Sequence, residues 1–259
     1  MSANAPLRLH WWKTVPNFGD APGSLVVGLI GGREVRHVAP KKAEMFAIGS
    51  MLQVVRRAFS DPREDRPPSI WGTRILHAVT SRGFLQNIRV ALVRGPITAA
   101  LLGVEHDRYG DPGLLTNEAL PHHGSRTDRI GIVPHHTLVD NPELANLIAS
   151  DPAYILMDPH KDVAEVCHQI ASCAHILTSS LHELIVADAY GVPNTWIDPK
   201  GQSRLKDHDY AESVGQADMA VPTPLTDIDL RKTITYADHI DACRDALRQS
   251  FPAHLKAQA

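Results

Sequence analysis

Short apolar runs bounded by polar turns recur along most of the chain and are separated by amphipathic stretches. Such runs are typical of buried strands, whereas apolar residues spaced by three and four positions indicate one face of a helix. The runs predict strands at residues 7–12, 34–38, 45–48, 69–71, 88–93, 130–133, 154–157, 175–178 and 195–197. Because helical patterns fall between them, we expect an α/β fold with mostly parallel strands covered by helices.

The clearest predicted helix spans residues 163–173, where apolar side chains recur on one face. Those side chains are Val163, Val166, Cys167 and Ile170. A second helix is predicted over 181–190, because Gly191 follows it and glycine commonly ends helices. The last is predicted near 238–251, with Ile240, Cys243, Leu247 and Phe251 buried.

Polar and turn residues gather in the segment PHHGSRTD, residues 121–128, after which strands and helices alternate afresh. We therefore expect two Rossmann-like domains facing a cleft, at residues 1–121 and 129–225. C-terminal helices over 226–259 are expected to pack back on the first domain. In such folds ligands bind beyond the carboxyl ends of the strands.

The composition argues against several classes of partner and of binding site. The chain has 259 residues, is 43% hydrophobic and has a formal charge of -3 with scattered basic residues, which argues against a nucleic-acid partner. No leader or membrane segment is evident, so we expect a cytosolic protein. The odd number of cysteines, without a C-x-x-C pair, argues against disulfides and a zinc ribbon. The histidines lack metal-ligand spacing, so no metal is expected.

Several segments share one local design, a strand followed by a polar turn that opens a helix. In Asn17-Phe18-Gly19-Asp20, Asp20 is either a helix cap or an active-site residue. Arg94, followed by Pro96 at a helix start, favours a carboxylate or phosphate site over a surface ion pair. Ser179 and Ser180 are expected to satisfy the first N–H groups of the next helix.

Four further candidates follow from position along the chain. His182 lies in the first turn of that helix, where the dipole favours a bound anion. Asp111 lies in a tight turn and is either structural, a sugar-hydroxyl ligand or a base. His135 ends a strand and is either structural or catalytic. Residues 204–210 lack apolar periodicity, so we predict an irregular loop that is either simply solvated or closes over the cleft.

The motifs in their order resemble one family. They are NFGD, AIGS, WG, VRGP, YGDP, a strand ending in Pro134-His135, SSLH, LIVADAYGVP and R-x-K-x-x-D-Y. From Trp11 to Gly215 this series resembles the polysaccharide pyruvyltransferases, and most of all the short bacterial ketal pyruvyltransferases of exopolysaccharide synthesis.

The resemblance implies a fold similar to GT-B glycosyltransferases, with phosphoenolpyruvate as co-substrate, a sugar diol as acceptor and no cofactor. The first domain would take the acceptor and contribute Arg94, and the second would take the donor. Two departures stand out. Ser180 replaces an arginine of longer relatives, and Glu183 replaces a small residue. Glu183 either points away, pairs with a cation or marks a changed acceptor.

The resulting hypothesis gives three groups of residues. The catalytic candidates are His182, Asp20, Asp111 and His135. The donor-binding candidates are Arg94, Ser179, Ser180, His182, Arg204 and Lys206. The acceptor-binding candidates are Asn17, Asp20, Trp71, Asp209 and Tyr210.

Two other functions fit the sequence. A nucleotide-sugar glycosyltransferase of the GT-B type would use the same fold and similar cationic sites. A sugar-binding or assembly protein would keep the fold without catalysis. By analogy with the family, a lipid-linked oligosaccharide acceptor would bring the protein to the inner face of the membrane.

Overall fold

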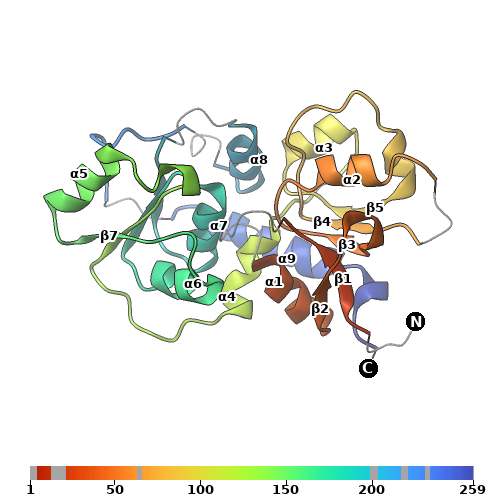
Figure 1. Ribbon diagram of the computed structural model, residues 1–259, viewed down its shortest axis with the longest axis horizontal. Helices are drawn as coiled ribbons and strands as arrows, with labels where there is room; N and C mark the ends of the chain where they lie inside the picture. Colours follow the sequence, from red (N-terminus) through yellow and green to blue (C-terminus); the bar gives the residue numbers. More distant parts are fainter. Residues whose placement is uncertain are drawn as a thin grey trace.

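A computed structural model describes residues 5–12, 22–62, 66–198, 204–216, 221–230 and 234–258, apart from the side chain of His136. The strands form two separate, fully parallel sheets (Figure 1). The first has the order β2-β1-β3-β4-β5, and the second has the order β7-β6-β8-β9.

Every predicted strand corresponds to a strand of the structure. The first sheet contains β1 (Leu7–His10), β2 (Val35–His37), β3 (Met45–Phe46), β4 (Ser69–Trp71) and β5 (Arg89–Leu92). The second contains β6 (Ile130–Val133), β7 (Tyr154–Leu156), β8 (His175–Thr178) and β9 (Asn194–Trp196). The predicted parallel α/β class is confirmed, while the domain limits, the cleft and the likeness to GT-B enzymes stay predictions.

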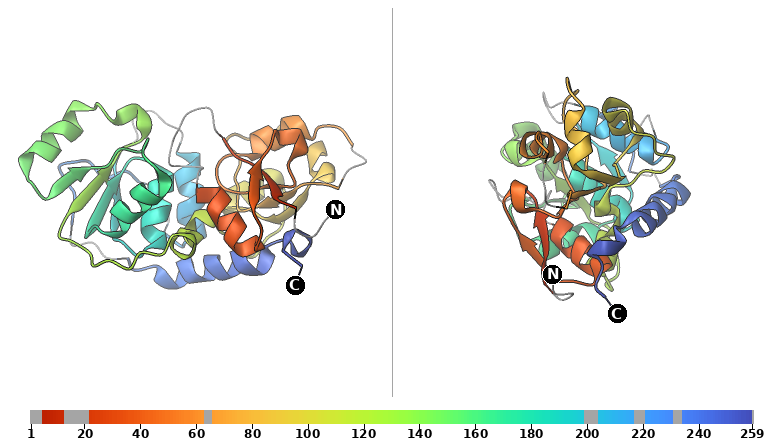
Figure 2. Two further views of the ribbon diagram at one scale, coloured as in Figure 1. Left: turned by 60° about the horizontal axis from the view of Figure 1, so that its bottom comes forward. Right: turned by 90° about the vertical axis from the view of Figure 1, so that its right-hand side faces the viewer.

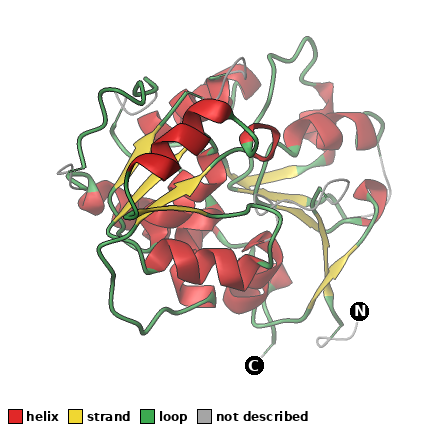
Figure 3. Ribbon diagram, turned by 60° about the vertical axis from the view of Figure 1, so that its left-hand side comes forward, coloured by secondary structure: helices red, strands yellow, loops and turns green. Residues whose placement is uncertain are grey.

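Helices surround both sheets, as Figure 3 shows by colour. The α-helices are α1 (Pro22–Gly31), α2 (Leu52–Ala58), α3 (Pro96–Leu102), α4 (Thr116–Ala119), α5 (Pro142–Ser150), α6 (Val163–Ala171), α7 (Leu181–Ala189), α8 (Leu205–Ser213) and α9 (Ala237–Ser250). Short 3₁₀ helices lie at Pro40–Lys42, Gly83–Asn87, Pro112–Leu115, His136–Leu138 and Ala253–Leu255. Within the described ranges, no helix is long and apolar enough to cross a membrane.

The three clearest helical patterns are confirmed as α6, α7 and α9. The Asp162 side chain caps α6 by accepting hydrogen bonds from the N–H groups of Ala164 and Glu165. Beyond α7, Gly191 has a φ of 65°, a conformation that favours glycine.

Helix α9 runs beneath both halves of the molecule (Figure 2, left). The indole Nε1 of Trp71 donates a hydrogen bond of 3.0 Å to the carbonyl of Leu247 on α9. Trp71 also packs edge-on against Phe251, with 5.0 Å between ring centroids. Trp71 is fully buried, so this geometry does not support its predicted role in acceptor binding. Its large ring instead anchors α9 to the first sheet.

The prediction of an irregular loop at 204–210 is wrong, because residues 205–213 form helix α8. Two of its buried residues are the carboxylates Asp207 and Asp209, so the helix lacks the apolar periodicity that predicts one. Tyr210 is fully buried and donates a 2.6 Å hydrogen bond to Asp188 on α7. Tyr236 donates a second, of 2.8 Å, to the same carboxylate. Tyr210 is therefore a core residue, and its position does not support the predicted acceptor contact.

Candidate active site

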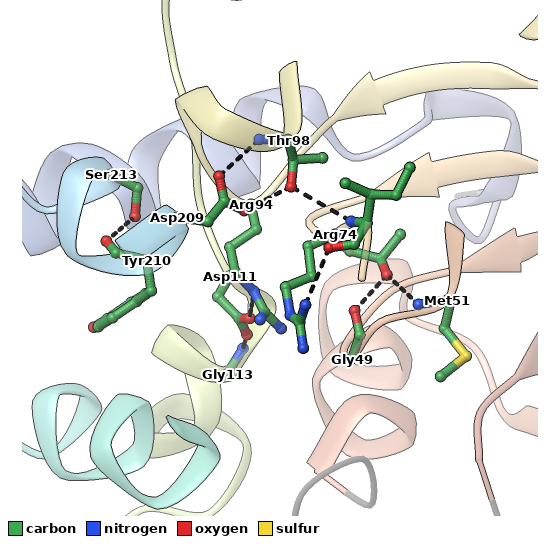
Figure 4. A network of polar contacts seen from close by, with 12 residues as sticks. Gly49, Met51, Arg74, Arg94, Thr98, Asp111, Gly113, Asp209, Tyr210 and Ser213 are labelled. Atoms are coloured by element: carbon green, nitrogen blue, oxygen red, sulfur yellow. Dashed lines mark hydrogen bonds and ion pairs between the residues drawn. The ribbon is translucent and has the colours of Figure 1, made fainter. Parts of the chain in front are cut away.

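An ion pair inside the protein joins two of the predicted site residues. Nε of Arg94, just after β5, lies 2.5 Å from Oδ2 of Asp111, and both side chains have 0% exposure (Figure 4). The other oxygen of Asp111 accepts a 2.8 Å hydrogen bond from the N–H of Gly113. In the part of the chain that the structure describes, Nη1 and Nη2 of Arg94 have no hydrogen-bond partner. Asp111 thus holds Arg94 in place while two buried donors stay available to an anion.

This pairing limits what Asp111 can do. Both of its oxygens are engaged, so the carboxylate is better placed to position Arg94 than to act as a base or to bind a sugar hydroxyl. Gly72 lets this turn approach the sheet. It has a φ of 75°, and a Cβ there would lie 2.3 Å from Cδ of Pro112.

The start of helix α3 does attract an anion, but the anion belongs to the protein. The N–H of Thr98 donates a 2.8 Å hydrogen bond to Oδ1 of Asp209, and its hydroxyl donates a 2.6 Å bond to Oδ2. A Cβ at Gly95 would lie 2.0 Å from the carbonyl oxygen of Asp209, so only glycine allows α8 this close. The prediction of an open helix start beside Arg94 is wrong. Asp209, which is buried, links α3 to α8 and is not exposed to an acceptor.

The hydroxyls before α7 connect strand ends. Oγ of Ser179 accepts a 2.9 Å hydrogen bond from the backbone N–H of His135, so these two candidates do meet. The hydroxyl of Thr178 accepts a bond from the N–H of Ser180 and donates one to the carbonyl of Val133. Ser180 makes no side-chain capping bond to α7, contrary to the prediction. Its side chain bonds the carboxyl group of Glu183 instead.

His182, in the first turn of α7, is only partly exposed. Burial, reinforced by the charges of Arg94, Lys206, Arg74 and His135, holds the pKa of His182 well below its ordinary value. The imidazole is therefore neutral at pH 7. The same interactions show that the predicted donor residues Arg94, His182 and Lys206 gather in one region.

Glu183 is buried beside Lys206. Burial raises the pKa of the Glu183 carboxyl to about 7, and Lys206 opposes this rise. Burial also lowers the pKa of Lys206, which Glu183 and Asp207 oppose. Of the three roles left open for Glu183, the structure supports pairing with a cation.

Sequence reasoning missed two residues of this cluster. Arg74 is 4% exposed and follows β4 as Arg94 follows β5, which is the signal that could have revealed it. Asp207 is also 4% exposed, and its oxygens have no hydrogen-bond partner on any other described residue. Burial raises the pKa of Asp207 to about 6, against the opposing charges of Lys206, Arg74 and Arg94. Asp207 reaches this cluster through helix α8, which the sequence did not predict.

The remaining candidates line a pocket or lie outside the described residues. Arg204 is exposed and, with Ser179, lines a pocket of about 870 Å³ formed mainly by α5 and residues 221–226. Asn17 and Asp20 lie outside the described residues. Among the described side chains, no group of three or more His, Cys, Asp or Glu residues is arranged to hold a metal ion.

Residues 84–201 match the family model for polysaccharide pyruvyl transferase. This match supports a place in the polysaccharide pyruvyltransferase family. The matched segment includes Arg94, Asp111, His135 and His182. Arg74 and helix α8 lie outside it.

Two relatives extend the comparison. The chain is 27% identical over 218 residues to the succinoglycan biosynthesis protein ExoV of Rhizobium meliloti, covering 81% of the chain and 60% of that protein. It is 32% identical over 117 residues to an uncharacterized protein of Acanthamoeba polyphaga mimivirus, covering 41% of the chain and 40% of that protein. The chain thus matches less than two thirds of the length of either relative.

Proposed function

We propose that this protein moves the pyruvyl group of phosphoenolpyruvate onto a sugar diol and forms a pyruvate ketal in a cell-surface or exopolysaccharide. The observation behind the proposal is the buried Arg94, which keeps two unpartnered donors beside His182 within the segment that matches the family. The similarity to a succinoglycan biosynthesis protein supports a polysaccharide acceptor.

A buried guanidinium with open donors favours an anionic ligand, because burial without hydrogen bonds is costly for a charged group. Phosphoenolpyruvate has both a carboxylate and a phosphate, and the planar fork of arginine binds either through two parallel hydrogen bonds. Lys206 adds a second cation from α8. Arg204, at the neighbouring pocket, keeps only an assisting role in the proposal.

The proposed chemistry has two steps. One sugar hydroxyl adds through its oxygen to C2 of phosphoenolpyruvate, C3 takes a proton to become a methyl group, and a base takes the hydroxyl proton. The second hydroxyl then forms a bond to C2 as the C2–O bond to phosphate breaks. Phosphate leaves with that electron pair and the remaining proton is released. One ketal and one phosphate are formed, and no cofactor takes part.

These steps need groups that move protons. His182 is neutral at pH 7 and lies among the cations that would hold the leaving phosphate, so we assign it to that phosphate. Asp111 is engaged with Arg94, so it is a poor base. We therefore propose Asp207 for proton transfer, because its oxygens have no hydrogen-bond partner on another described residue. Asp20 keeps its predicted role as the alternative carboxylate.

A titration followed by thermal unfolding tests the donor. We expect phosphoenolpyruvate to raise the melting temperature of the wild-type protein and a nucleoside diphosphate to leave it unchanged. The opposite pattern would indicate a nucleotide-sugar glycosyltransferase. Phosphate release from phosphoenolpyruvate that depends on an oligosaccharide acceptor would exclude a non-enzymatic role.

Two substitutions test the roles proposed for Arg94 and His182. Arg94→Ala and His182→Ala should release phosphate at least about a hundredfold more slowly than the wild type, by the scale of losing a charge-stabilising group. Arg36→Ala is the matched control, since Arg36 is exposed on the outer strand β2. Wild-type rates in both site variants would refute the assignment.

A further inference from the structure

Arg74 is a buried cation that the reaction above does not use. Its Nη1 donates a 3.0 Å hydrogen bond to the carbonyl of Ile75, but its Nε has no hydrogen-bond partner within the described ranges. The side chain is 4% exposed, so water offers little compensation. A buried guanidinium left partly unpaired is rare and calls for a ligand or a neighbouring carboxylate.

A second arginine lies next to Arg74. Strands β4 and β5 are neighbours in the sheet, so the residues that follow them, Arg74 and Arg94, emerge at the same edge. Figure 4 shows their guanidinium groups side by side and pointing the same way. The charge of Arg94, after burial, is the largest influence that lowers the pKa of Arg74, to about 9. Two like charges this close repel each other in a low-dielectric interior.

The carboxylates nearby compensate this repulsion only in part. Asp111 is engaged by Arg94 and the Gly113 N–H, and Asp209 is engaged by Thr98. Asp207 is the remaining carboxylate that influences Arg74, and burial raises its pKa to about 6. Unpartnered nitrogens of two arginines therefore meet at one place, and together they match the oxygens of a phosphate group.

We propose that Arg74 and Arg94 together form the binding site for the phosphate group of the donor. Arg74, which follows strand β4 of the first sheet, supplies the second guanidinium. Ser180, which follows strand β8 of the second sheet, contributes no charge. The identity of the donor as phosphoenolpyruvate rests on the proposed function, whereas the phosphate site itself rests on the two arginines.

Isothermal titration with inorganic phosphate and with phosphoenolpyruvate tests the site, using the wild type, Arg74→Met, Arg74→Lys and the exposed control Arg36→Met. We expect Arg74→Met to weaken phosphate binding by about tenfold to a hundredfold, the scale of a charge-assisted hydrogen bond. Arg74→Lys should retain part of the affinity, and Arg36→Met all of it. Without ligand, Arg74→Met should melt at the wild-type temperature or above, because a buried repulsion is removed.

Wild-type phosphate affinity in Arg74→Met would overturn the proposal, and a lowered melting temperature with that affinity would mark Arg74 as structural. If Arg74→Met does not fold, Arg74→Lys and a crystal structure of the wild type grown with phosphate decide. An anion bonded to Nε of Arg74 supports the site, and its absence overturns it.

The measurements distinguish failure of the proposed phosphate site from failure of phosphoenolpyruvate as the proposed donor. A wild-type protein that binds phosphate through Arg74 but not phosphoenolpyruvate keeps the site and refutes the donor. Turnover of phosphoenolpyruvate by Arg74→Met with the wild-type KM refutes the site and keeps the donor. A wild-type protein that binds neither ligand refutes both.

Discussion

The carboxylate of Asp209 binds both the backbone N–H and the hydroxyl of Thr98, at 2.8 and 2.6 Å. These residues are 111 positions apart. The contact joins the start of α3, beside the first sheet, to α8, the helix that brings Lys206 and Asp207 to the arginines. The start of α3 thus binds a carboxylate of the protein itself, and this contact helps to assemble the site.

Asp209→Asn should destabilise the protein by about 1.5 to 3 kcal/mol, because it weakens two buried hydrogen bonds to a charged group. It should also reduce phosphate release, since α8 loses its anchor. Urea unfolding gives the stability. Asp107→Asn, at a side chain that is 91% exposed, is the control for carboxylate loss. Unchanged stability in Asp209→Asn would show that the contact does not hold α8.

Asp111→Ala should destabilise the protein by about 3 to 5 kcal/mol, because Arg94 would be left as an uncompensated buried charge. The double variant Arg94→Met with Asp111→Ala should recover much of this loss, since neither charge remains. Denaturant unfolding of both single variants and the double variant completes the cycle. Additive losses would contradict the coupling.

Asp207→Asn should slow acceptor-dependent phosphate release by about a hundredfold to ten-thousandfold if Asp207 transfers a proton. The pH–rate profile of the wild type should show a limb near pH 6, where Asp207 titrates, and the variant should lack it. A variant with reduced rate but an unchanged limb would assign the limb to another group.

The same residue predicts a pH dependence of stability. The pKa of Asp207 is raised from 3.8 to about 6, so the folded state holds its proton more tightly than the unfolded state. Its contribution is fully present below pH about 4 and is lost as the pH rises through about 6, by an amount on the order of 2 to 3 kcal/mol. Asp207→Asn should therefore flatten the fall in unfolding free energy between pH 4 and 7, measured by urea titration. An equal slope in the wild type and the variant would refute the shift.

Tyr210→Phe should cost about 1 to 2 kcal/mol of stability, because the buried Asp188 loses one of its hydrogen-bond donors. The KM for the acceptor should stay unchanged, since the ring is enclosed. Thermal unfolding and steady-state kinetics measure the two effects. A raised acceptor KM with normal stability would restore the acceptor role predicted from the sequence.

The sequence by itself determined the strands, helices α6, α7 and α9, the parallel α/β class and the resemblance to one family. These follow from patterns within short stretches, such as the apolar repeat of α6 or the glycine after α7, and from motifs in a fixed order. It also predicted that Arg94 and His182 share a site.

Only the tertiary structure decided which polar residues meet and which are enclosed. Trp71 and Tyr210 look like ligand contacts in sequence but lie in the core, because partners far along the chain cover them. Helix α8 buries the carboxylates Asp207 and Asp209, so apolar periodicity does not predict this helix. Arg74 joins Arg94 because β4 and β5 are neighbours, and Asp209 fills the start of α3. These relations depend on how distant segments pack, and local periodicity contains no information about that packing.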